Sequence, residues 1–133
     1  MTRATGSLSK TVIVSGATFG IGHDVAVYLA KAGFNVIGFG LEQAPVSSIA
    51  TASVAKLNSD AQARDLPLSF VAGDVTSEAD VDRAIQAALE YGHGLFGVVN
   101  NAAIGPLGTI MDTAPDMFLR ILEVNLKGPY LMC

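Results

Sequence analysis

The 133-residue sequence has few of the residues that build disulfide, metal or nucleic-acid sites. Its single cysteine, Cys133, has no partner for an intrachain disulfide, which agrees with a reducing compartment. The two histidines, His23 and His93, give no metal-ligand spacing, so we expect no metal site. Eight basic residues against twelve acidic ones give a net charge of −4. We therefore expect no basic face for nucleic acid or anionic lipid.

Long hydrophobic runs are also missing. The first ten residues are polar, and the apolar run that follows breaks at Gly16, too short for a signal-peptide core or a membrane span. We therefore expect a cytoplasmic protein with no membrane partner. Half of the residues are apolar and 15% are charged, a globular composition. A chain of this length has the size of one domain, covering residues 1–133.

The periodicity alternates between strand-like and helix-like segments. Short apolar or β-branched runs predict four strands, at 11–15, 35–40, 68–75 and, running into a small-residue loop, 95–103. Apolar residues at helical spacing follow each strand. The first helix has them at 21, 25, 29 and 32 and ends at Gly33, and the second covers 46–57. The third covers 77–89 after a capping-box-like start, and the fourth begins at 113 and carries Phe118, Ile121, Leu122 and Val124. This order predicts an α/β fold, a three-layer doubly wound parallel sheet.

Three glycines follow the first predicted strand in the stretch "SGATFGIG". They lie where a helix begins, and the unpaired N–H groups and dipole of a helix N-terminus attract anions. Gly16 would allow a tight turn, Gly20 the close approach of a pyrophosphate, and Gly22 close packing of helix on strand. A tight strand-to-helix turn in some other α/β protein is the alternative.

The spacing Gly-x-x-x-Gly-x-Gly resembles the glycine loop of the short-chain dehydrogenases/reductases, with Ser15 at the usual threonine. Three further segments resemble that family in the same order: "GDVT", "NNAA" and "EVNLKGPY". The resemblance covers essentially the whole chain. It implies a Rossmann fold, NAD or NADP as cofactor, and hydride transfer between the nicotinamide and a small carbonyl or alcohol substrate.

The resemblance also implies which residues bind the cofactor. They are Gly16, Thr18, Phe19, Gly20, Ile21, Gly22, Gly40, Leu41, Asp74, Val75, Asn101, Ala102 and Ala103. In this assignment the Asp74 carboxylate accepts from the adenine amino group and the Val75 backbone pairs with a ring nitrogen. Asp74 could also simply close an Asx turn, and Asn100 or Asn101 could satisfy local backbone groups. Ala103 stands where the family has glycine.

Asn125 matches the asparagine of the family's catalytic tetrad, which bends its helix and holds a water in a proton relay. An asparagine within a helix is otherwise unfavourable. The alternative is that the helix simply degrades before Gly128 and Pro129.

The choice between NAD and NADP stays open. An acidic residue at the end of the second strand would bind the ribose hydroxyls of NAD, and a basic one there or in the glycine loop would accept the phosphate of NADP. The matching positions, Phe19, Gly40 and Leu41, are all uncharged, while Glu42 lies next to them.

The family's proton donor is a tyrosine followed four residues later by lysine, and these 133 residues contain no Tyr-x-x-x-Lys. We therefore expect a chain truncated after the fourth strand and its helix: a cofactor-binding half that lacks the catalytic serine, tyrosine and lysine and is inactive alone. The fourth strand would then be a sheet edge, with Phe118, Leu122 or Leu126 exposed, so we expect a homo-oligomer or marginal stability. The alternatives are a non-catalytic dinucleotide-binding or interaction module, and a structural fragment without cofactor.

Overall fold

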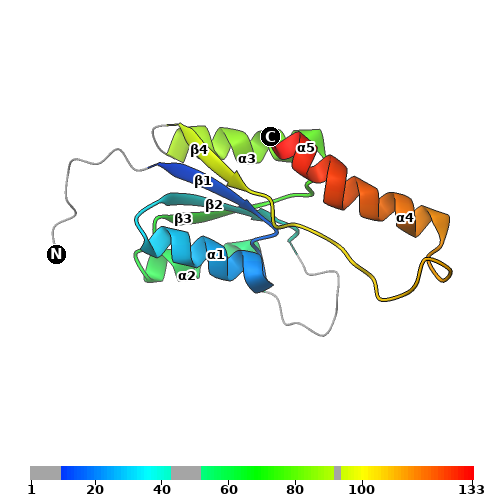
Figure 1. The fold of residues 1–133 in the computed structure, drawn as a ribbon. Coiled ribbons are helices and arrows are strands. Elements are labelled where there is room, and N and C mark those ends of the chain that lie inside the picture. Colours follow the sequence, from blue (N-terminus) through cyan, green and yellow to red (C-terminus); the bar gives the residue numbers. More distant parts are fainter. Residues whose placement is uncertain (1–9, 43–51, 92–93) are drawn as a thin grey trace.

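Four parallel strands form one sheet in the order β3-β2-β1-β4 (Figure 1). The computed structural model describes residues 10–42, 52–91 and 94–133. The elements are β1 (Thr11–Ser15), α1 (Gly20–Lys31), β2 (Asn35–Gly40), α2 (Val54–Ala63), β3 (Leu68–Ala72), α3 (Glu78–Tyr91), β4 (Leu95–Val99), α4 (Pro115–Leu122), the π-helix η1 (Glu123–Lys127) and α5 (Gly128–Met132).

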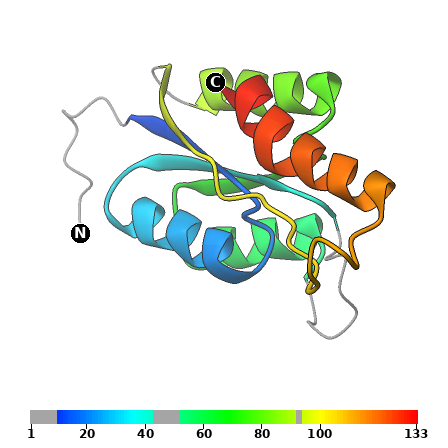
Figure 2. The same cartoon turned by 45° about the vertical axis from the view of Figure 1, so that its right-hand side comes forward.

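Helices cover both faces of the sheet, which confirms the predicted three-layer α/β architecture (Figures 1 and 2). Helices α1 and α2 lie on one face, where Val14 and Val36 belong to the hydrophobic core. Helix α3 and the end of the chain lie on the other face, over a second core that includes Ile13 and Ile37. Neighbouring residues of one strand thus enter opposite cores, as the period of two requires.

The bounds of β1 and β2 agree with the sequence pattern. Strand β4 ends at Val99, before the small-residue loop, and β3 ends at Ala72, short of the predicted residue 75. The chain turns there toward α3, and the Asp74 N–H donates to Asp80 Oδ2 at 2.9 Å. The predicted helix over 46–57 lies partly outside the described residues. Its described part begins at Val54, where Ser53 Oγ caps the helix by accepting from Lys56 N at 3.3 Å.

The face that helix α1 buries is turned from the predicted one and overlaps it only in part. Val25 and Leu29 of the predicted stripe are half-buried against the core, but Ile21, where the stripe begins, is 77% exposed. The buried positions are Gly22, Ala26 and Ala30. A Cβ on Gly22 would overlap the Gly16 carbonyl, so the helix begins very close to the turn after β1. Small side chains face the sheet for this reason, and the larger apolar ones lie beside them.

The last helix does not degrade at Gly128 and Pro129, contrary to the alternative considered above. Helix α4 passes through one π turn, η1, and continues as α5. Gly128 permits a close contact, since a Cβ there would lie 2.9 Å from Val75 Cγ2. Helix α4 reaches beyond the sheet (Figure 1), and its Phe118 is 52% exposed. Leu126, in η1, is 67% exposed.

Candidate functional site

A cavity of about 370 Å³ lies at the carboxyl ends of the strands. This is where the strand order reverses, since β2 and β4 lie on opposite sides of β1, and such switch points bind ligands in open α/β sheets. Every residue that the resemblance assigned to cofactor binding lines the cavity. Four further residues line it that the sequence did not indicate: Gly73, Ile104, Arg120 and Val124.

The glycine turn has the geometry proposed for it. Gly16 and Gly20 have φ angles of +67° and +61°, which favour glycine, and a Cβ on Gly16 would lie 2.8 Å from Ala102 Cα. A Cβ on Gly20 would have no heavy atom within 4 Å, so the space beside this glycine is open. Phe19 caps helix α1 without a side-chain hydrogen bond, and the first turn contains no acidic residue. The positive end of the helix therefore faces the cavity without a built-in anion.

Ser15 and Asn101 fasten this turn to the segment after β4. Ser15 Oγ accepts from the backbone N–H groups of Asn101 and Ala102, both at 3.1 Å. In return, Asn101 Nδ2 donates to the carbonyl of Ser15 at 3.0 Å and to that of Gly16 at 3.3 Å. These bonds join distant segments of the chain, unlike a local turn, and they fix the loops on two sides of the cavity relative to each other.

The end of β2 forms another wall. Thr18 Oγ1 is buried without a hydrogen-bond partner among the described residues, and a Cβ on Gly40 would lie 3.0 Å from it. Leu41 lines the cavity and is partly exposed. Glu42 points to helix α2, where its Oε1 accepts from Val54 N at 3.0 Å. The charge nearest to the end of β2 is thus already engaged by a helix N-terminus.

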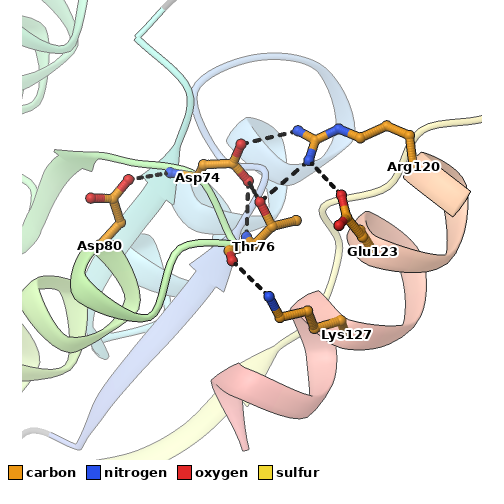
Figure 3. Close-up of polar contacts among 6 residues, drawn as sticks. All are labelled: Asp74, Thr76, Asp80, Arg120, Glu123 and Lys127. Carbon is orange, nitrogen blue, oxygen red and sulfur yellow. Dashed lines mark hydrogen bonds and ion pairs between the residues drawn. The ribbon is translucent and has the colours of Figure 1, made fainter. Parts of the chain in front are cut away.

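The turn after β3 carries a polar network (Figure 3). Asp74 Oδ1 accepts from Thr76 N at 2.9 Å and from Thr76 Oγ1 at 2.8 Å, so the Asx turn considered above is present. Asp74 Oδ2 accepts from Arg120 Nη2 at 3.1 Å. Arg120 also contacts Glu123 Oε2 at 3.3 Å, and Lys127 Nζ donates to the Thr76 carbonyl at 3.4 Å. Side chains from α4 and η1 thus bind both ends of the turn.

These contacts keep the two central groups charged. Partial burial on its own raises the pKa of the Asp74 carboxyl, but the hydrogen bonds from Thr76 and Arg120 outweigh it and lower the pKa below the ordinary 3.8. The pKa of Arg120 is raised, first by its hydrogen bond to Asp74, against the opposing effect of burial, and further by Glu123. The cavity therefore has an ionised carboxylate and a guanidinium side by side.

Asn125 holds the segment that follows β4. Its Oδ1 accepts from Ile104 N and its Nδ2 donates to the Ile104 carbonyl, both at 2.8 Å. Asn125 lies in the π turn η1 and does not line the cavity. Its bonded partner Ile104 and the preceding residue Val124 both line it. The structure thus places Asn125 behind the cavity wall.

The missed residues differ in how they could have been found. Gly73 and Val124 lie within the motifs "GDVT" and "EVNLKGPY", and Ile104 directly follows "NNAA", so assigning whole motifs and their next residue to the site would have included all three. Arg120 is different, because its partner Asp74 is 46 positions away and no local pattern joins them. Only the tertiary fold brings Arg120 of α4 to the turn after β3.

Two further findings concern the described residues. Histidine, cysteine and acidic side chains there form no group of three or more that could hold a metal ion. No helix in the same ranges combines the length and apolar character needed to cross a membrane.

Comparison with known proteins identifies the family. The family model for short chain dehydrogenases matches residues 10–133. The short chain dehydrogenase tazN of Aspergillus terreus is 38% identical over 128 residues, which cover 92% of this chain and 26% of that protein. The human dehydrogenase/reductase SDR family member 4 is 30% identical over 133 residues, which cover 99% of this chain and 45% of that protein.

A solved structure shows the same relationship. The 3-ketoacyl-(acyl-carrier-protein) reductase of Brucella melitensis, crystallised with NADH, superposes with a TM-score of 0.77 at 32% identity. The match covers 95% of this chain and 48% of that one, so the chain spans less than half the length of each of these proteins. The glycine turn, the sheet order and the family match agree, and the chain belongs to the short-chain dehydrogenase/reductase family.

Proposed function

We propose that this chain binds a nicotinamide dinucleotide in the cavity, as the cofactor-binding part of an oxidoreductase. The observation that carries the proposal is the glycine turn, which opens the uncapped N-terminus of α1 to the same cavity that Asp74 and Asn101 line. When bound, the dinucleotide supplies or receives the hydride that is exchanged with a carbonyl or alcohol carbon. The Brucella reductase, 32% identical, supports the choice of ligand because it was crystallised with NADH.

Each part of the cavity suits one part of such a ligand. The open space at Gly20 and the N–H groups of α1 would hold the pyrophosphate. Asp74 and the Val75 backbone would hold the adenine. Asn101, Ala102 and Ala103 would lie beside the nicotinamide end. The cavity volume falls within the range of small-molecule and cofactor sites.

The proposal covers both NAD and NADP. Phe19, Gly40 and Leu41 bring no charge to the wall near the end of β2, and Glu42 is hydrogen-bonded to α2. Neither an acidic partner for ribose hydroxyls nor a cation for a 2′-phosphate stands at the usual positions.

Asn125 is our candidate for a contribution to catalysis. Its side chain holds Ile104 in the cavity wall, and the α-helical donor for its own carbonyl is missing because residue 129 is proline. This supports the proposed role of Asn125 in holding a water for proton transfer. A proton donor of the Tyr-x-x-x-Lys type is absent from these 133 residues. We therefore propose that they do not reduce carbonyl compounds alone, and that they act in the cytoplasm in a self-associated form.

Calorimetric titration of the chain with NAD, NADH, NADP and NADPH tests the proposal. Gly20→Val should abolish binding, because the side chain would fill the open space and strain a positive φ. Gly97→Val is the matched control, since Gly97 in β4 also faces open space but lies outside the cavity lining. Equal loss in both variants, or no binding by the unaltered chain, would refute the proposal.

A further inference from the structure

The hydrogen bonds of Asp74 leave one acceptor position free. A carboxylate oxygen accepts about two hydrogen bonds. Oδ1 already accepts two, from the N–H and the hydroxyl of Thr76, whereas Oδ2 accepts one, from Arg120. Asp74 lines the cavity, so Oδ2 is the oxygen with capacity for a ligand donor.

Arg120 helps to determine where that oxygen lies. The carboxylate is planar, so rotation about the Cβ–Cγ bond moves both oxygens together; the Thr76 bonds restrain it at Oδ1, and Arg120 supplies the one side-chain anchor at Oδ2 among the hydrogen bonds described for Asp74. Arg120 is itself held, because Glu123 accepts from its Nη1 at 3.3 Å and Thr76 Oγ1 lies 3.4 Å from the same nitrogen. Asp74 and Arg120 are therefore bonded to each other, and each has further partners, without a ligand (Figure 3).

We propose that Arg120 is a positioning residue for the cofactor: it orients Asp74 Oδ2 to accept the 6-amino group of adenine, and so gives the site its preference for adenine over 6-oxopurines. This inference rests on the proposed dinucleotide function. Fixing an acceptor in advance avoids the entropy loss of ordering it on binding, which increases affinity. A 6-oxo group has no proton to donate, so it gains nothing from the oriented oxygen.

Arg120 acts here through orientation and not through ionisation. Burial raises the pKa of the Asp74 carboxyl, but the Thr76 hydrogen bonds would still oppose that rise without Arg120, and the group would remain ionised at neutral pH. Its hydrogen bonds to Thr76 would remain, and only the anchor at Oδ2 would be lost.

The test compares two ligands, NAD and nicotinamide hypoxanthine dinucleotide, which carries a 6-oxo group in place of the amino group. The unaltered chain should bind NAD more tightly. Arg120→Gln should weaken NAD binding by about threefold to tenfold without weakening the hypoxanthine ligand, because it removes the orientation of Asp74 Oδ2 and not the acceptor itself; complete loss of a hydrogen bond to a charged group would cost more than about tenfold. Arg83→Gln is the matched control: Arg83 pairs with Asp80 at 2.6 Å, close to the same turn but outside the cavity lining, and should change neither affinity.

A double-mutant cycle separates positioning from a direct effect of the guanidinium. In an Asp74→Ala background, Arg120→Gln should cause no further loss of NAD affinity, because the group that it positions is gone. Equal weakening of both ligands, tighter NAD binding, or a second loss in the Asp74→Ala background would overturn the proposal. Should Arg120→Gln fail to fold by circular dichroism, Arg120→Lys decides by the same comparison, since lysine keeps the charge without the planar fork.

The proposed function and this inference fail in different ways. If the unaltered chain binds neither dinucleotide, the proposed function fails, and the role of Arg120 fails with it. If the unaltered chain binds NAD and Arg120→Gln keeps the same ratio of the two affinities, only the role of Arg120 is refuted.

Discussion

Replacing Asn125 with alanine removes both hydrogen bonds that hold the Ile104 peptide, and the chain contains a matched control. Asn58 in α2 binds the Phe70 peptide in the same way: its Nδ2 donates to the Phe70 carbonyl at 3.0 Å, and Phe70 N donates to its Oδ1 at 2.7 Å. Both asparagines lie in helical segments. The gain in helix propensity on replacement by alanine is therefore similar and largely cancels in the comparison.

The two replacements should lower the free energy of unfolding by different amounts. Each hydrogen bond contributes about 0.5–1.5 kcal/mol, so Asn58→Ala, which breaks two partly buried bonds, should cost about 1–3 kcal/mol. Water can replace the exposed bonds of Asn125, so Asn125→Ala should cost only about 1 kcal/mol. Urea denaturation of both variants measures these values.

Dinucleotide binding should show the opposite order. Ile104 lines the cavity and loses its fixed position in Asn125→Ala, so we expect affinity to fall by about threefold to tenfold, equivalent to about 1 kcal/mol. Asn58→Ala should bind as the unaltered chain does, although it is the less stable of the two. Weaker binding in Asn58→Ala to the same extent would refute the reasoning, because it would show that affinity follows global stability.

The other predictions concern the turn, acid stability, association and turnover. Gly22→Ala should lower the free energy of unfolding by about 1–3 kcal/mol in a thermal or urea melt, because its Cβ would overlap the Gly16 carbonyl; an unchanged melting temperature would contradict the packing described. The pKa values of Asp74 and Asp80 are both lowered, so their contribution to stability is present above the ordinary 3.8 and is lost as pH falls through the folded values. The stability of Asp74→Asn should therefore fall less steeply than that of the unaltered chain as pH drops below about 4. The same pH dependence in both proteins would count against the Asp74 hydrogen-bond network. Leu126→Glu should reduce self-association in sedimentation velocity, because Leu126 is 67% exposed on the last helical segment, and a monomeric unaltered chain would remove the basis for this prediction. Carbonyl-dependent oxidation of NADPH or NADH by the 133 residues alone should stay at the buffer rate, and clear turnover would show that the proton donor is within this chain.

Much of the fold follows from local patterns in the sequence. The bounds of β1 and β2 coincide with two short apolar runs, because strands covered on both faces have no polar positions to blur their ends. The glycine turn could also be predicted from the sequence, since positive φ angles and close contacts leave few alternatives to glycine. The end of β3 could not be predicted in this way, because the apolar pattern continues to Val75 while the chain already turns toward α3, where the Asp74 N–H donates to the side chain of Asp80.

Features that depend on the distance between elements could not be predicted. The face that α1 buries follows from how closely the helix begins to the turn after β1, and the larger apolar residues of α1 alone indicate a face that overlaps it only in part. The ion pair between Arg120 and Asp74 joins positions that only tertiary packing brings together. The π turn that contains Asn125 was also missed, since its breakers predict an end of the helix and not an extra residue in one turn.

The stretch from Arg120 to Asn125 is attached to other segments at both of its ends. This restricts the number of residues in the stretch more than their identity. Arg120 reaches the turn after β3, and five positions later Asn125 reaches the segment after β4. Each added or deleted residue rotates everything beyond it by about 100° in an α-helix, so a change in length between these two residues would turn one of them away from its partner. Exposed positions between them, such as Leu122, can change their side chain without this effect. Insertions and deletions here should therefore be far more damaging than substitutions.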